Sequence, residues 1–167
     1  LLYNEKGLSY VSTSLKNKTI LHINFLKGSL GWRIKRSEHE SSLKKAIGKH
    51  THQLTIFDAT AGQLNDSMIF LSLGHKVVAV EQSKILYLLV SDAIKRADDE
   101  LPILENLKFI NGNSIEIFKK DNNQFDLIYL DPMYPIVKKN VKRSGNLNCI
   151  KEILSFENLM NHGDNLI

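Results

Sequence analysis

Four apolar runs rich in β-branched and aromatic residues lie in the middle of the chain, near residues 54–58, 76–81, 107–111 and 125–130. Runs of this kind are typical of strands that are buried on both faces of a parallel sheet. Segments with helical periodicity follow the first three runs, near residues 66–73, 84–98 and 114–119. Strands that alternate with helices predict an α/β fold, with a parallel sheet and helices on both faces.

Acidic residues end three of the four predicted strands. Asp58, Glu81 and Asp131 close their runs, and Gly62 follows in the first turn. Because the carboxyl ends of parallel strands meet at one edge of a sheet, we expect these residues to shape one ligand site. The first turn contains one glycine where a dinucleotide-binding turn has three, so the pattern disfavours NAD and favours a ligand without phosphates.

The second and third strands suggest how such a ligand is held. Glu81 lies about 20 positions after Asp58, where an acidic residue binds ribose hydroxyls in related sheets; the alternative is a solvated glutamate at a strand end. Asn113 and Ser114 follow the third strand and either bind an adenine edge or cap the next helix. Their spacing favours the cap.

The fourth strand ends in Asp131-Pro132-Met133-Tyr134-Pro135, the most informative motif of the chain. The exocyclic amine of a nucleobase is a weak nucleophile, so an enzyme that alkylates it needs acceptors for its N–H groups and a surface that holds the ring. Asp131 offers a carboxylate, Pro132 a rigid turn and Tyr134 an aromatic face. A simple turn in which Asp131 caps a helix is the alternative interpretation.

These motifs resemble those of a known family, the RsmJ-type methyltransferases. The resemblance lies in Asp58-Ala59-Thr60-Ala61-Gly62 with Asp66, in Glu81 after its valine-rich strand, and in Tyr129 to Pro135. It extends upstream to His22 to Leu30 and to the basic residues Arg33 and Lys35, and covers roughly residues 20–145. Members of that family use S-adenosylmethionine to methylate N2 of a guanine in bacterial 16S ribosomal RNA.

The resemblance implies a Rossmann-like class I methyltransferase fold. It predicts an N-terminal extension of short strands and a helix over residues 1–50, and an incomplete methyltransferase core over residues 51–167. The positions that correspond to cofactor contacts are Asn65, Asp66, Glu81, Gln82, Asn113, Ser114 and Asp131. Asp131, Pro132 and Tyr134 would hold the target amine during in-line methyl transfer, without a metal and without a covalent enzyme intermediate.

The chain departs from the family pattern in two places. Leu64 and Asn65 stand where the family has a glycine and an arginine, and residues 36–42 lack the glycines of a family loop. A complete sheet of this type also has three more strands after the fourth, and residues 136–167 contain only a basic stretch, a predicted helix over 149–160 and a polar end. The chain is therefore expected to be a fragment or a shortened descendant of an enzyme.

Composition favours a cytoplasmic globular protein. The 167 residues carry a formal net charge of +4 and a single cysteine, Cys149, and contain neither a long apolar run nor a leader pattern. Basic residues flank the predicted site: Arg33, Lys35 and Arg36 before it, and Lys138, Lys139, Lys142 and Arg143 after it. They predict phosphate contacts with 16S ribosomal RNA or the small ribosomal subunit, or else a solvated basic surface.

Other functions fit the sequence less well. The same strand tip suits an amine methyltransferase that acts on DNA adenine or on a protein glutamine, and a catalytically silent remnant that binds RNA is a further alternative.

His50 and His52 have no third ligand at a suitable spacing, so no metal site is expected. The sequence does not indicate how many chains associate.

Overall fold

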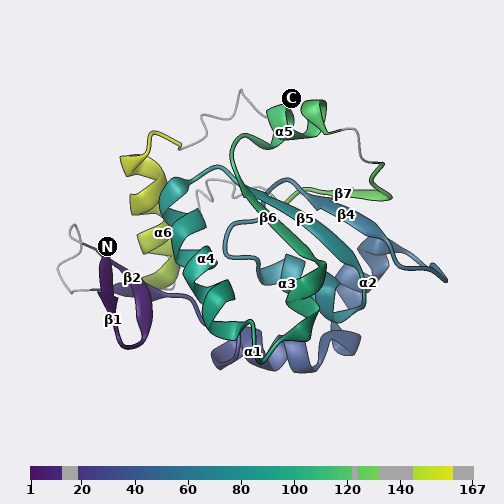
Figure 1. Ribbon diagram of the computed structural model, residues 1–167, viewed down its shortest axis with the longest axis horizontal. Helices are drawn as coiled ribbons and strands as arrows, with labels where there is room; N and C mark the ends of the chain where they lie inside the picture. The colour runs from purple at the N-terminus through teal and green to yellow at the C-terminus, as the bar shows by residue number, and fades with distance from the viewer. Residues whose placement is uncertain (13–18, 122–123, 132–144, 160–167) are drawn as a thin grey trace, which may run out of the picture.

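A four-stranded parallel sheet forms the centre of the molecule, in the strand order β6-β5-β4-β7 (Figure 1). The computed structural model describes residues 1–12, 19–121, 124–131 and 145–159. The strands are β4 (Thr55–Asp58), β5 (Lys76–Glu81), β6 (Leu107–Asn111) and β7 (Leu127–Tyr129). Each lies within one of the four apolar runs, and the predicted α/β fold is confirmed.

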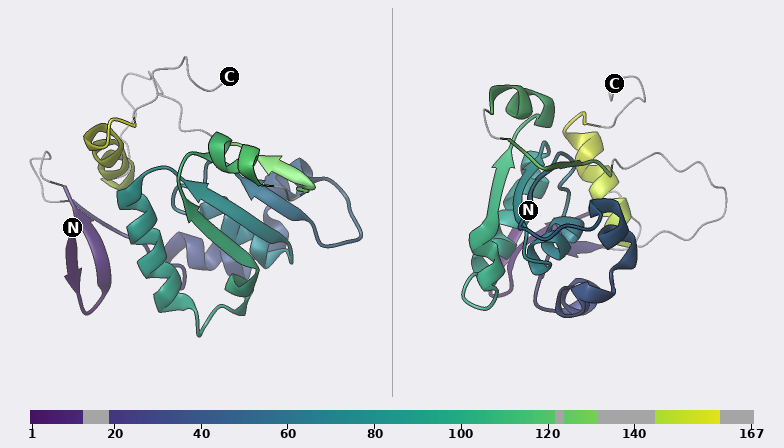
Figure 2. Two further views of the ribbon diagram at one scale, coloured as in Figure 1. Left: turned by 45° about the horizontal axis from the view of Figure 1, so that its top comes forward. Right: turned by 90° about the vertical axis from the view of Figure 1, so that its right-hand side faces the viewer.

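Helices cover both faces of this sheet (Figure 2). They are α3 (Asn65–Ser72), α4 (Lys84–Ala97) and α5 (Ser114–Lys120). Alternate residues of β5 serve the two faces: Val77 and Ala79 belong to the large core with α3 and α4, whereas Val78 and Val80 join a smaller cluster with Phe57. The ring of Phe118 in α5 lies 5.4 Å from that of Phe57. Both faces are apolar because both are covered.

The chain reverses the direction in which it adds strands after β6. It runs outward from β4 through β5 to β6, and then returns to pair β7 with the opposite side of β4, all in parallel. The strand order therefore reverses between β4 and β7, which makes this the topological switch point of the sheet. Open α/β sheets bind their ligands in the crevice at such a switch point.

The N-terminal residues form a second, antiparallel sheet and a helical layer. The strands are β1 (Leu2–Asn4), β2 (Gly7–Val11) and β3 (Ile20–His22), followed by α1 (Gly28–Lys35), the 3-10 helix η1 (Ser37–His39) and α2 (Ser41–Ile47). This region thus holds more helix than expected. Leu21, Ile23 and Phe25 enter the same core as the helices of the parallel sheet, so the N-terminal region packs against the parallel-sheet unit.

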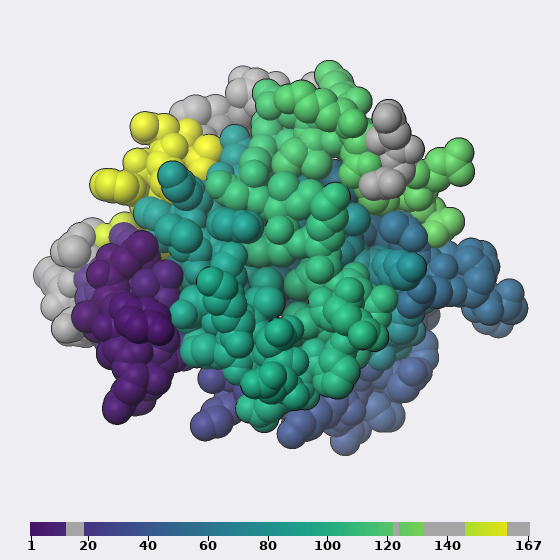
Figure 3. Space-filling model, in the orientation of Figure 1, coloured from purple at the N-terminus to yellow at the C-terminus, as the bar shows by residue number. Residues whose placement is uncertain are grey.

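Two further helices complete the described part of the chain. The 3-10 helix η2 (Pro102–Asn106) precedes β6, and α6 (Gly145–Phe156) begins earlier than the helix predicted over 149–160. Helix α6 contacts β3 and α4. Figure 3 shows it above the hairpin of β1 and β2, at one side of the molecule. Within the described residues, no helix has the length and apolarity needed to span a bilayer.

A buried histidine closes the amino end of the β4–β5 pair. His75 is 5% exposed, and its Nδ1 accepts a hydrogen bond from the Leu54 N–H at 3.2 Å. Its Nε2 lies 3.3 Å from Nε2 of His50. Because Nδ1 must remain an acceptor, the proton of the neutral ring is on Nε2. Burial lowers the pKa of His75, and the nearby His50 and His52 lower it further.

We expect His75 to make the fold sensitive to acid. Since its pKa is lower in the folded chain, the unfolded chain takes up the proton first as the pH falls below about 6.5, and the free energy of unfolding decreases there. In His75→Asn the amide oxygen still accepts from Leu54 but cannot be protonated, so urea unfolding should lose part of this acid dependence. His75→Ala should cost about 2–3 kcal/mol at neutral pH. An unchanged acid dependence in His75→Asn would contradict this assignment.

Candidate functional site

The turn between β4 and α3 is built around the carboxylate of Asp58. Asp58 is 2% exposed; its Oδ2 accepts from Ser67 Oγ at 2.5 Å, and its Oδ1 accepts from the Thr60 N–H at 3.0 Å. Burial raises the pKa of Asp58, while the hydrogen bonds from Ser67 and Thr60 oppose that shift. Asp58 therefore fixes the shape of the turn rather than facing a ligand directly.

Two residues with positive φ bring this turn to the start of α3. Gly62 has φ +52°, and Leu64 has φ +61° with a fully buried side chain. A left-handed conformation is unfavourable for leucine, which explains why a glycine suits this position in the family pattern. Asn65 and Asp66 follow as the first residues of α3. Asn65 is exposed and Asp66 is partly buried, so both lie at the mouth of the turn.

Glu81 lies at the end of the neighbouring strand, with its side chain directed back to this turn. It is 8% exposed, and its carboxylate accepts from the N–H groups of Ser83, at 2.7 Å, and of Gly62. Burial raises its pKa to about 7, and the charges of Glu157 and Asp58 add to the rise. Glu157, which follows α6, accepts hydrogen bonds from Ser83 Oγ and from the Ile85 N–H. Glu81 is thus poised to change its charge near neutral pH.

The third strand contributes a helix cap. Asn113 Oδ1 accepts from the N–H groups of Ile115 and Glu116 at 3.0 and 3.1 Å, so the capping interpretation is confirmed. Ser114 is the first residue of α5. Gln82 is exposed beside them, and its carbonyl accepts from Asn111 Nδ2 at 3.4 Å. These residues line the β6 end of the edge where Glu81 lies.

The fourth strand brings Asp131 next to the first turn. The Asp131 N–H donates to Thr60 Oγ1 at 2.8 Å, and the Ala59 N–H donates to the Tyr129 carbonyl at 3.1 Å. The side chain of Asp131 is exposed. Pro132 and Tyr134, the other residues predicted to hold the target amine, lie outside the described residues, and their roles stay predictions.

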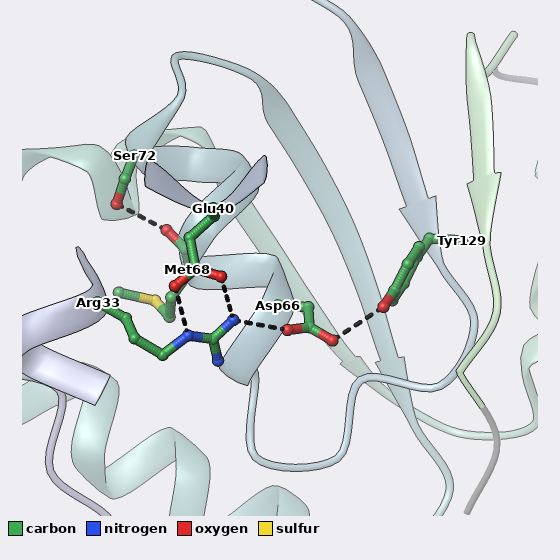
Figure 4. Close-up of polar contacts among 6 residues, drawn as sticks. All are labelled: Arg33, Glu40, Asp66, Met68, Ser72 and Tyr129. Carbon is green, nitrogen blue, oxygen red and sulfur yellow. Dashed lines mark hydrogen bonds and ion pairs between the residues drawn. The ribbon is translucent and has the colours of Figure 1, made fainter. Parts of the chain in front are cut away.

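A chain of polar contacts crosses from the N-terminal region to the fourth strand (Figure 4). Arg33 of α1 pairs with Glu40 at 2.8 Å and with Asp66 at 3.3 Å. The other oxygen of Asp66 accepts from the Tyr129 hydroxyl at 2.9 Å. Burial raises the pKa of Tyr129, and Asp66 raises it further, so the hydroxyl stays a donor.

The electrostatics of this edge identify the ligands that it can accept. Carboxylates of Asp58, Asp66, Glu81 and Asp131 all lie at the carboxyl ends of β4, β5 and β7 or on the first turn of α3. Even with Arg33 paired to Asp66, the described groups at this edge are mainly acidic, which disfavours the phosphates of a nucleotide and favours a ligand that carries positive charge and hydroxyl groups. S-adenosylmethionine, with its sulfonium, ammonium and ribose, has this chemistry.

Among the described residues, the His75 ring and the Ser67 hydroxyl are engaged in contacts within the fold. They hold no cluster of three or more His, Cys, Asp or Glu side chains suited to a metal ion. His50 and His75 approach each other, but Nδ1 of His75 already accepts a hydrogen bond, so Nε2 carries the proton and cannot bind a metal. Ser67 is fully buried beside Asp58, where no substrate reaches its hydroxyl.

Comparison with protein-family models decides the family. Residues 1–161 match the model described as "Putative SAM-dependent methyltransferase". The chain belongs to this family. The resemblance drawn from its motifs is therefore confirmed, and so is the class I methyltransferase fold. The crystal structure of a SAM-dependent methyltransferase from Neisseria gonorrhoeae is 30% identical in sequence with a TM-score of 0.60, over 73% of this chain and 52% of that one.

Curated relatives of this methyltransferase family carry a more specific name. The chain is 33% identical to the ribosomal RNA small subunit methyltransferase J of Desulfotalea psychrophila, over all of this chain and 66% of the relative. It is 31% identical to the enzyme of that name from Francisella tularensis subsp. novicida, over 82% of this chain and 58% of the relative. The chain thus spans less than two thirds of the length of these relatives.

Sequence reasoning found the acidic residues of the site but missed the partners that hold them. Ser67, Thr60, Ser83 and Glu157 all bond to the site's carboxylates or to the residues beside them. Ser67 had a detectable signal, since it is the third residue of α3 and a helical side chain points back toward the start of its helix, here toward the end of β4. Glu157 had none, because its contact with α4 depends on the packing of α6.

The backbone at Leu64 predicts an unusual order of stability. In most helical positions alanine stabilises more than glycine, but a left-handed residue reverses that order. Both Leu64→Ala and Leu64→Gly lose the buried side chain, at a cost of roughly 2–4 kcal/mol. Only glycine also relieves the strained φ, so Leu64→Gly should be the more stable of the two by about 1 kcal/mol. Urea unfolding of both variants checks this, and a more stable Leu64→Ala would refute it.

Proposed function

We propose that this chain binds S-adenosylmethionine and transfers its methyl group to the exocyclic N2 amine of a guanine in 16S ribosomal RNA. The observation that carries this proposal is the set of carboxylates at the ends of β4, β5 and β7, which fits a cationic nucleoside and disfavours a nucleotide. The names of the curated relatives support the choice of ribosomal RNA. Such a substrate also fits the cytoplasmic location expected from the sequence.

The strand order suggests how the cofactor would lie. Adenine would lie near Asn113, Ser114 and Gln82 at the β6 end, and the ribose hydroxyls would donate to Glu81 on β5. The amino-acid end would then reach the β4–α3 turn, where Asn65 and Asp66 begin the helix. This order directs the methyl group toward the end of β7.

Asp131 would act on the target amine. Its exposed carboxylate follows β7, while its backbone is held to Thr60 of the cofactor turn. The cofactor supplies an electrophilic methyl group, and the carboxylate accepts an N–H of the amine as positive charge develops on that nitrogen. A guanine stacked in an RNA helix would have to turn out to reach this position. Positioning, rather than a covalent intermediate, then provides most of the rate gain.

The raised pKa of Glu81 makes cofactor binding dependent on pH. Ribose hydroxyls donate to an ionised carboxylate, so binding should release a proton below a pH of about 7 and should strengthen as the pH rises through that value. Calorimetric titration with S-adenosylmethionine at about pH 6 and pH 8, in buffers of different ionisation enthalpy, measures both effects. Glu81→Gln should bind more weakly at the higher pH and lose the proton release. Proton release that persists in Glu81→Gln would assign the effect to another group.

Asp131→Ala should nearly abolish methyl transfer while the chain stays folded. Loss of a positioned acceptor for developing charge should lower the rate by roughly 10²–10³-fold. Little stability should be lost, because the Asp131 side chain is exposed and the N–H that bonds Thr60 is retained. Transfer of a labelled methyl group to small-subunit ribosomal RNA measures activity, and circular dichroism measures folding.

The methyl-transfer assay, together with measurements of RNA and cofactor binding, separates the rival functions. Label in DNA or in protein, with none in RNA, would favour an amine methyltransferase with another substrate. RNA binding without cofactor binding by a folded chain would favour the silent remnant. If Asp131→Ala kept the full activity of the parent chain, the role given to Asp131 would be wrong.

A further inference from the structure

Arg33 reaches the start of α3 from the N-terminal region, outside the parallel sheet. Its Nε and Nη2 donate to the two carboxylate oxygens of Glu40 at 2.8 and 2.9 Å, and Nη2 also donates to Asp66 Oδ1 at 3.3 Å. Arg33 is therefore paired with two carboxylates, whereas the sequence predicted either a phosphate contact or a solvated basic surface. A two-point contact with Glu40 fixes the plane of the guanidinium.

Asp66 links Arg33 to the fourth strand. Its Oδ2 accepts from the Tyr129 hydroxyl, so each of its oxygens is held by a different segment of the chain (Figure 4). Tyr129 is the last residue of β7, paired with Asp58 of β4 and two positions before Asp131. One carboxylate thus joins α1, α3 and β7, and it cannot rotate without breaking a hydrogen bond.

We propose that Arg33 is a positioning residue for the amino-acid end of the cofactor, acting through Asp66. The inference rests on the proposed function. A carboxylate oxygen has two lone pairs, so Asp66 keeps acceptor sites after bonding Arg33 and Tyr129. Those sites are held in one orientation at the mouth of the β4–α3 turn, where the α-ammonium of the cofactor arrives. In the proposed function the nucleoside end lies elsewhere, beside Glu81 at the end of β5.

Because different residues hold the two ends of the cofactor, substitution of Arg33 should weaken only ligands that contain the amino-acid end. S-adenosylhomocysteine contains the amino-acid end, whereas 5′-methylthioadenosine has the same nucleoside without it. Arg33→Ala should weaken S-adenosylhomocysteine binding by roughly five- to tenfold, because Asp66 loses the contact that fixes its orientation, and should change 5′-methylthioadenosine binding by less than about twofold. Arg33→Lys should give an intermediate loss, since lysine lacks the fork that holds Glu40 and Asp66 together. Calorimetry and competition between the two ligands measure these constants.

Tyr129→Phe completes the test, because its hydroxyl holds the other oxygen of Asp66. It should show the same selectivity, and the double variant with Arg33→Ala should lose less affinity than the product of the two single losses. Lys44→Ala is the matched control, since it removes an exposed ion pair with Glu38 in the same N-terminal region. It should leave both affinities unchanged. Thermal unfolding confirms that each variant is folded.

The outcomes separate this inference from the function on which it rests. If Arg33→Ala and Arg33→Lys weakened both ligands equally, Arg33 would serve only the fold, and the inference would be overturned while the cofactor site stood. Strictly multiplicative losses in the double variant would overturn the action through Asp66. If neither ligand bound the folded parent chain, the proposed function would fall, and the inference with it.

Discussion

Parallel pairing of β7 with β4 is the constraint on which the site depends. It places Tyr129 opposite Asp58 and so brings Asp131 beside Thr60, although these two residues are far apart in the sequence. Since β5 pairs with the other edge of β4, the point where the strand order reverses lies between β4 and β7. In the proposed function, the cofactor would lie along the ends of β5 and β4 and the target base at the end of β7, as expected for a ligand site at such a point.

The same strand pairing brings several carboxylates together at the carboxyl ends of the strands, and their charges must be compensated. Bringing several carboxylates together costs free energy unless each is bonded or partly protonated. Asp58 is satisfied by Ser67 and Thr60, and Asp66 by Arg33 and Tyr129. Glu81 is balanced differently, because a pKa of about 7 lets it hold a proton. A cationic ligand with hydroxyl groups would relieve the remaining repulsion, which links binding to the charge state of the site.

The fold of the parallel sheet could be predicted from the sequence, because every core strand was a distinct apolar run with a polar residue at its end. Valines on both faces of β5 predicted a strand covered on both sides, and the acids at the strand ends predicted one functional edge. The N-terminal region was less predictable. Its helices α1 and α2 bury few residues, Gly31 and Ile34 in α1 and Leu43 in α2, so their apolar pattern is weak, and tertiary packing decides their boundaries.

Partners of the site residues were beyond sequence reasoning for a physical reason. A strand end predicts where a carboxylate lies, because strand direction and pairing fix it, but not which donor arrives from another layer. Arg33 shows the difference: in the sequence it is one of several basic residues before the core, and only the packing of α1 on α3 turns its charge toward Asp66. The N-terminal extension therefore belongs to the site as well as to the core, and the orientation of Asp66 at the switch point depends on a residue outside the sheet.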